Sequence, residues 1–181
     1  ERVPGDLIET GAWRGGMTIF MRALLQAHGD TERSVWVADS FSGLPAPKGS
    51  GDGWDYSEVE YLKVSLEQVQ ANFRRFGLLD ERVRFLPGWF CDTLPTAPIT
   101  QLAVLRLDGD MYSSTRDALV NLYHRVSPGG FVIVDDYYSW PACRRAVDEF
   151  RAERGLLEPL QAIDWTGAFW RVAQADAVGS G

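Results

Sequence analysis

Two short stretches of the sequence bring acidic residues together in a pattern that could bind a cation. Asp108 and Asp110 follow the apolar run that ends at Leu107, and Asp135 and Asp136 follow a later run, Val132-Ile133-Val134. Residues two apart at the end of an extended segment can point the same way, so these carboxylates could reach one site. They would repel one another unless a cation neutralises them, and a hard divalent ion is the economical explanation. Oxygen-only ligation suits Mg²⁺, Ca²⁺ or Mn²⁺ rather than zinc.

Two earlier strand ends have the features of a nucleotide-type cofactor site. The segment from Glu9 to Gly16 reads E-T-G-A-W-R-G-G and places glycines between a strand and a helix. Glycine lets the backbone approach a ligand closely, and the N-terminus of a helix offers free N–H groups. Asp39 follows the second strand, where a carboxylate can accept hydrogen bonds from a ribose diol. Together they indicate a site for a cofactor of this kind.

Purely structural roles could account for parts of this pattern. A tight turn without a ligand would use the same glycines, and Asp39 could be an ordinary loop or cap aspartate. One aspartate of each acidic pair could cap the helix that follows, as Asp110 could before a helix at 113–126. Capping would explain two of the four aspartates and leave the other two without a role.

The elements that must position these residues alternate along the chain. Short apolar runs predict strands at 6–10, 34–38, 83–86, 102–107 and 130–134, and helical spacing predicts helices at 15–28, 58–76, 113–126 and 141–154. This order indicates an α/β fold with a mostly parallel sheet and helices on both faces. Two further strand candidates, 160–163 and 168–172, could form an antiparallel pair. Ligands of such sheets bind beyond the carboxyl ends of the strands, where the strand order reverses.

Composition limits the size and the partners of the protein. A chain of 181 residues fits one domain, and a net charge of −7 disfavours nucleic-acid binding. Cys91 and Cys143 form neither a redox or zinc motif nor a disulfide framework, which favours reduced thiols in a cytoplasmic enzyme. No stretch approaches the ~18 apolar residues of a membrane span, so no membrane partner is expected. The chain begins at Glu1 without a methionine, which is consistent with preceding residues that are missing.

Five segments together resemble the macrocin O-methyltransferase (TylF-type) family, whose members methylate sugar hydroxyls on macrolide and aminocoumarin natural products. They read D-L-I-E-T-G-A-W-R-G-G, V-W-V-A-D-S-F-S-G-L-P, G-W-F-C-D-T-L-P, L-R-L-D-G-D-M-Y-S-S-T and G-G-F-V-I-V-D-D-Y. The resemblance runs from about Val3 to Trp170. It implies a class I methyltransferase (Rossmann-like) sheet with an antiparallel C-terminal strand, in one domain at 1–175 followed by a tail at 176–181.

The resemblance also implies roles for individual residues. Asp108, Asp135 and Asp136 are similar to the Mg²⁺ ligands of the family, and Asp110 is similar to its general base. The residues that would contact S-adenosylmethionine are Glu9, Thr10, Gly11, Asp39, Ser40, Trp89 and Phe90. Family members usually carry helices before the first motif that help close the site and make dimer contacts. This chain begins almost at that motif, so we expect the domain to lack those helices. The sequence leaves open whether the protein forms a homo-oligomer.

The function expected from these features is methyl transfer. It would depend on S-adenosylmethionine and Mg²⁺ and act on a vicinal-diol hydroxyl of a small-molecule acceptor, such as a deoxysugar of a macrolide or aminocoumarin. A catechol-type phenol would satisfy the same two-oxygen chelation. Two alternatives belong to other classes: a metal-dependent glycosyltransferase or phosphotransferase that uses the D-G-D motif, and a non-catalytic small-molecule binding module.

Overall fold

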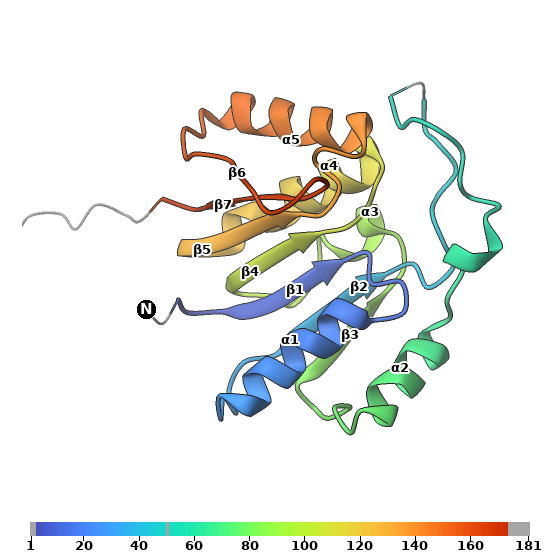
Figure 1. Ribbon diagram of the computed structural model, residues 1–181, viewed down its shortest axis with the longest axis vertical. Helices are drawn as coiled ribbons and strands as arrows, with labels where there is room; N and C mark the ends of the chain where they lie inside the picture. Colours follow the sequence, from blue (N-terminus) through green and yellow to red (C-terminus); the bar gives the residue numbers. More distant parts are fainter. Residues whose placement is uncertain (1–2, 50, 174–181) are drawn as a thin grey trace, which may run out of the picture.

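The strands of the protein form one seven-stranded sheet in the order β3-β2-β1-β4-β5-β7-β6 (Figure 1). The computed structural model describes residues 3–49 and 51–173. The first five strands are parallel, β7 pairs antiparallel with β5, and β6 pairs antiparallel with β7, which confirms the predicted mixed α/β sheet. The strands are β1 (Asp6–Thr10), β2 (Val35–Asp39), β3 (Val83–Pro87), β4 (Leu102–Leu107), β5 (Val126–Val134), β6 (Gln161–Ala162) and β7 (Ala168–Arg171). The tail predicted at 176–181 lies outside the described residues, as do residues 174 and 175 of the predicted domain.

Helices cover both faces of the sheet. Helices α1 (Gly16–Ala27) and α2 (Leu66–Arg75) lie on one face, and α4 (Tyr112–Leu122) and α5 (Pro141–Arg154) lie on the other (Figure 1). The largest core cluster lies between the strands and the α4–α5 pair and contains fully buried residues such as Leu105, Leu119, Phe150 and Trp170. A strand buried on both faces needs apolar residues in succession, which is why Leu102–Leu107 is almost entirely apolar.

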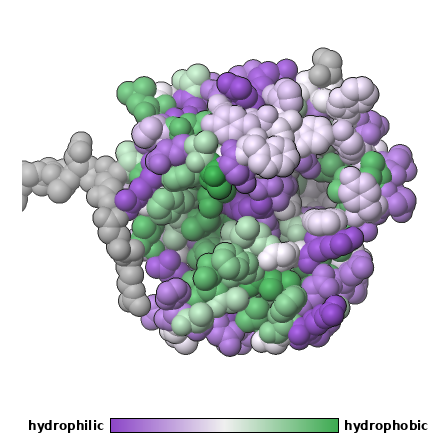
Figure 2. Space-filling model, viewed as in Figure 1, coloured by the Kyte–Doolittle hydropathy of each residue, from purple (hydrophilic) through white to green (hydrophobic). Residues whose placement is uncertain are grey.

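The face on the α1 side is covered less completely. Side chains of β4 and β5 on this side, such as Val104, Phe131 and Ile133, are only partly buried. Helix α1 itself exposes Phe20 and Leu24. Figure 2 shows a hydrophobic area where Figure 1 draws α1 and the strands beside it. None of the helices described in the structure is sufficiently long and apolar to span a membrane.

The predicted helix at 58–76 is wrong in its first part. The structure has a short 3₁₀ turn at Glu60–Leu62, and α2 starts only at Leu66. The Ser65 hydroxyl accepts a hydrogen bond from the Gln68 N–H at 3.3 Å, which caps the helix. Val64 before the cap and Val69 after it belong to one core cluster, as in a hydrophobic staple. The S-x-x-Q pattern of a capping box, from Ser65 to Gln68, therefore marks the start of the helix. It was missed because the helical spacing of apolar residues continues on its N-terminal side.

Two other element boundaries differ from the prediction. The helix expected at 113–126 ends at Leu122, and a 3₁₀ turn (Tyr123–Arg125) follows. Strand β5 begins at Val126 rather than Gly130, because Val126 pairs with Leu102 before the register shifts. A Cβ at Gly130 would lie 2.8 Å from the Ser127 carbonyl oxygen, so this irregular part of the strand requires a glycine. The short helix α3 (Phe90–Thr93) was not predicted.

The packing of α2 can be tested with two phenylalanines three residues apart. Phe73 is fully buried, whereas Phe76, just beyond the end of α2, is 65% exposed. We expect Phe73→Ala to lower the free energy of unfolding by about 3–5 kcal/mol, since it removes a buried aromatic ring and leaves a cavity. Phe76→Ala, the control, should change it by no more than about 0.5 kcal/mol. Urea denaturation measures both, and equal losses would contradict this placement of α2.

Candidate active site

The carboxyl ends of four parallel strands lie next to one another, where the strand order reverses. Thr10 of β1 is in register with Ala38 of β2 and with Leu107 of β4, and Leu107 is in register with Val134 of β5. The residues that follow these positions are therefore neighbours in space, and they include predicted site residues: Gly11, Asp39, Asp108 and Asp135.

Gly11 allows the turn after β1 to lie directly against the turn after β4. Its backbone has a φ of 94°, and a Cβ at this position would lie 1.7 Å from the carbonyl oxygen of Asp108. The Asp108 N–H donates a hydrogen bond to the Thr10 carbonyl at 2.9 Å. Only glycine fits here. The segment from Glu9 to Gly16, which we call the cofactor loop, is therefore in backbone contact with the acidic turn after β4.

Asp39 connects the cofactor loop to the end of β2. Its Oδ2 accepts hydrogen bonds from the N–H groups of Ala12 (2.7 Å) and Trp13 (3.1 Å), and its Oδ1 accepts one from Phe41 N–H (2.7 Å). The Ser40 hydroxyl lies 3.4 Å from Oδ1 but donates its one proton to the Gly43 carbonyl at 2.7 Å. Oδ1 therefore has room for a further donor, such as a ribose hydroxyl, in addition to its role in the loop.

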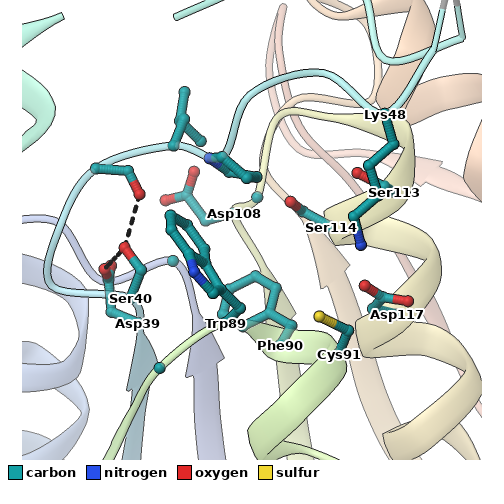
Figure 3. Close-up of a pocket in the computed structure, with 16 residues that line it drawn as sticks. Asp39, Ser40, Lys48, Trp89, Phe90, Cys91, Asp108, Ser113, Ser114 and Asp117 are labelled. Carbon is teal, nitrogen blue, oxygen red and sulfur yellow. Dashed lines mark hydrogen bonds between the residues drawn. The ribbon is translucent and has the colours of Figure 1, made fainter. Parts of the chain in front are cut away.

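A cavity of ≈ 180 Å³ opens beside these strand ends (Figure 3). Figure 3 shows Trp89 and Phe90 between Asp39 at one end and Asp117 at the other. Five predicted cofactor residues line the cavity: Gly11, Asp39, Ser40, Trp89 and Phe90. Glu9 and Thr10 do not, because they are 2% and 1% exposed and lie behind the wall. Several other lining residues were not among the predicted site residues: Lys48, Cys91, Ser113, Ser114 and Asp117.

Three of the predicted acidic residues form a compact group. Asp108, Asp135 and Asp136 each offer a carboxylate oxygen, and these oxygens lie within 4.8 Å of one another. Asp108 also lines the cavity, so the group and the cavity share a residue. Three carboxylates at this spacing fit the oxygen ligation that Mg²⁺ prefers.

The electrostatics of the group agree with a cation site. Burial raises the pKa of Asp108 to about 7, and Asp135 adds to the rise. Burial and the charge of Asp136 raise the pKa of Asp110 to about 8, and burial also raises the pKa of Asp136. Asp108, Asp110 and Asp136 thus resist ionisation in this acidic surrounding. A divalent ion among them would reverse this effect, so the donor set and its electrostatics fit the predicted ion.

Asp110 lies at the edge of this group in a strained backbone conformation. Its φ is 55°, a left-handed conformation that aspartate tolerates better than most residues and that recurs at functional sites. The capping role considered for Asp110 is filled by another residue. Helix α4 has no side-chain cap from Met111, and the Ser113 N–H donates instead to Oδ1 of Asp52 at 2.7 Å.

Arg106 corrects the expectation that a divalent ion alone offsets the clustered negative charge. It precedes Asp108 by two residues on β4, and its guanidinium forms ion pairs with Glu9, Asp108 and Asp135, the Asp108 pair at 2.6 Å. These three carboxylates raise the pKa of Arg106 against the lowering effect of its burial. One guanidinium neutralises one charge, so several carboxylates remain for a further cation. The only signal in the sequence was an arginine inside an otherwise apolar strand.

A buried aspartate holds the long loop after β2 against the site. Asp52 is 6% exposed, and its Oδ2 accepts a hydrogen bond from the Lys48 N–H at 2.8 Å while Oδ1 bonds α4. Lys48 and Ser113 both line the cavity. Tyr56 at the far end of the loop packs edge-on against Trp140, with ring centroids 5.3 Å apart. The loop therefore forms part of the cavity wall.

Comparison with known sequences agrees with this geometry. A model of the family "Macrocin-O-methyltransferase (TylF)" matches residues 1–172. The 8-demethyl-8-(2,3-dimethoxy-alpha-L-rhamnosyl)-tetracenomycin-C 4'-O-methyltransferase of Streptomyces olivaceus is 59% identical over 180 residues, which cover 97% of this chain and 69% of that protein. The demethyldecarbamoylnovobiocin O-methyltransferase of Streptomyces niveus is 56% identical over 174 residues, which cover 93% and 66%. The chain thus spans about two thirds of the length of these relatives.

Solved structures show the same fold. The O-methyltransferase NovP superposes with a TM-score of 0.93 at 55% identity, over 95% of this chain and 73% of that one. The calicheamicin methyltransferase CalS11 superposes with a TM-score of 0.75 at 23% identity, over 93% and 72%. These matches confirm the predicted class I methyltransferase sheet. Because the family model matches residues 1–172 and relatives that are 59% and 56% identical are O-methyltransferases, the chain belongs to the macrocin O-methyltransferase family.

Proposed function

We propose that this protein is an S-adenosylmethionine- and Mg²⁺-dependent O-methyltransferase that acts on one hydroxyl of a vicinal diol in a sugar of a secondary metabolite. One observation carries the proposal. Asp108 belongs to the group with Asp135 and Asp136, and it also lines the cavity bounded by Gly11 and Asp39. A cofactor in the cavity and an ion in the acidic group would therefore be immediate neighbours.

The relatives support a sugar as the acceptor. Their names describe O-methylation of a rhamnosyl-tetracenomycin, a novobiocin precursor and, for a relative from Micromonospora griseorubida that is 52% identical over 176 residues, mycinamicin III at its 3'' oxygen. The family match also argues against the glycosyltransferase and phosphotransferase alternatives. A purely binding role would not require Asp110 to adopt a strained conformation near three further carboxylates.

The chemistry divides between the bound groups and the residues of the chain. S-adenosylmethionine supplies the methyl group, and a divalent ion lowers the pKa of hydroxyl groups that it binds. Asp108, Asp135 and Asp136 would hold the ion. Asp110, beside Asp136, would accept the proton of the reacting hydroxyl, since the pKa of a general base is best placed near the working pH.

The cavity wall would favour the reaction by position and by exclusion of water. Asp39 and Gly11 would fix the cofactor at the strand ends, and holding both reactants in line removes much of the entropic barrier. Methyl transfer from a sulfonium to an alkoxide cancels charge, so a site shielded from water favours it. The loop held by Asp52 would provide that shield next to Lys48 and Ser113.

The role of Asp110 can be tested by its amide variant. We expect Asp110→Asn to lower kcat by about 10²–10⁴-fold, the usual contribution of a general base, because the amide cannot accept the proton. Formation of S-adenosylhomocysteine measures turnover, with the acceptors named for the relatives as trial substrates. Calorimetric titration with S-adenosylhomocysteine is the control and should give an affinity close to that of the unmodified protein. Unchanged turnover would remove Asp110 from this role.

The raised pKa values predict that stability without a divalent ion depends on pH. Burial raises the pKa of Asp108 to about 7 and the pKa values of Asp110 and Glu9 to about 8 in the folded protein, against ~3.9 for Asp and ~4.3 for Glu in an unfolded chain. Between these values the folded state binds more protons, so stability falls as pH rises from 6 to 8. The pKa of Asp80 is lowered, mainly by its hydrogen bond with Arg22, so this residue changes its protonation state only below this pH range and does not contribute to the effect.

Thermal unfolding at pH 6 and pH 8, with and without Mg²⁺, measures this dependence. In EDTA the melting temperature should be lower at pH 8, by about 2–4 °C for each kcal/mol of lost stability. Mg²⁺ should raise the melting temperature more at pH 8 than at pH 6, because less free energy is needed to deprotonate the carboxylates at the higher pH. An equal effect of Mg²⁺ at both values, or none, would count against an ion among these aspartates.

A further inference from the structure

Arg106 contacts acidic residues from three adjacent strands with one side chain. Its Nη1 donates hydrogen bonds to Oε1 of Glu9 and to Oδ2 of Asp108, the latter at 2.6 Å, and its Nη2 donates to Oδ1 of Asp135. Only 9% of the arginine side chain is exposed. Glu9 is the last residue but one of β1, whereas Asp108 and Asp135 follow β4 and β5. One guanidinium therefore joins the cofactor loop to the acidic group.

The pattern of these contacts leaves part of each aspartate available. Arg106 binds Oδ2 of Asp108 and Oδ1 of Asp135, so the other oxygen of each carboxylate can face a different ligand. The two side chains are 29% and 41% exposed, and both lie in turns after strands, where neighbours restrict a rotamer less than in the core. A planar guanidinium holds its partners in fixed directions, which the single ammonium of lysine does not do.

The third contact fixes the start of the cofactor loop. Glu9 is 2% exposed, and a buried carboxylate without a positive partner is costly. Arg106 provides that partner. Glu9 lies two residues before Gly11, which lines the cavity. Movement of Arg106 would therefore disturb both the loop that lines the cavity and the two aspartates.

We infer that Arg106 is a positioning residue that holds Glu9, Asp108 and Asp135 in one arrangement, so that the cofactor loop and the ion site are both preformed. The inference rests on the proposed function, because it assigns Arg106 to the two sites named there. Arg106 contacts neither acceptor nor methyl group in this role. It acts through the three carboxylates that it orients.

The test replaces Arg106 by lysine, which keeps the charge but cannot contact all three carboxylates in the same way. Electron paramagnetic resonance of Mn²⁺ measures ion binding, and calorimetry with S-adenosylhomocysteine measures the cofactor site. For Arg106→Lys we expect about 10-fold weaker Mn²⁺ binding, in line with the loss of other residues that orient metal ligands, and weaker S-adenosylhomocysteine binding as well.

Arg22 offers a matched control. Its side chain is also 9% exposed and forms an ion pair with Asp80, before β3 and away from the carboxyl ends of the strands. Arg22→Lys should lower the melting temperature while both affinities stay within about twofold of the unmodified protein. If Arg106→Lys likewise left both affinities within twofold, the inference would be overturned and Arg106 would be a structural residue only.

A neutral variant separates the loss of orientation from the change in charge. Arg106→Gln removes a positive charge beside the aspartates, which by charge alone would tighten Mn²⁺ binding. Loss of orientation has the opposite sign, so we expect weaker binding, and tighter binding would overturn the inference. The proposed function fails in a different way: the unmodified protein would then bind no Mn²⁺, and the inference would fail with it.

Discussion

The concentration of negative charge at the carboxyl ends of the parallel strands constrains the rest of this structure. Parallel strands end at the same edge of a sheet, so acidic residues that follow β4 and β5 are forced together, and Glu9 of β1 lies beside them. Burial makes this arrangement more costly, as the raised pKa values of Asp108 and Asp110 show. The positive charge of Arg106, inside the sheet, offsets part of this cost. The negative charge that remains would favour binding of a divalent cation.

The same edge explains why the cavity and the acidic group share Asp108. The strand order reverses between β1 and β4, so the connections that leave these two strands run in opposite directions and open space for a ligand. Gly11 then brings the cofactor loop into contact with the backbone of Asp108, and Asp39 ties that loop to β2. Family membership gives this geometry its chemical meaning, since methyl transfer to a hydroxyl needs a donor, a proton acceptor and an acceptor group side by side.

Local signals in the sequence predicted the strands, the acidic turns and the glycine loop, because each depends on residues close together in the chain. Long-range partners were not predictable in that way. Arg106 meets Glu9 only through the β1–β4 pairing, and Asp52 meets Ser113 across 61 residues of chain. Buried Glu9 and Thr10 looked like cofactor contacts because a motif does not show which side chains turn inward. The start of α2 was missed although Ser65 and Gln68 marked it.

We propose that Asp108, Asp135 and Asp136 hold a divalent ion beside the cavity. Anomalous X-ray diffraction from crystals grown with Mn²⁺ and S-adenosylhomocysteine would locate such an ion. We expect one strong manganese peak about 2 Å from an oxygen of each aspartate, the ligation expected for an ion of the Mg²⁺ type, with the nucleoside between Asp39 and Trp89. A fully occupied nucleoside site without manganese at these aspartates would contradict it.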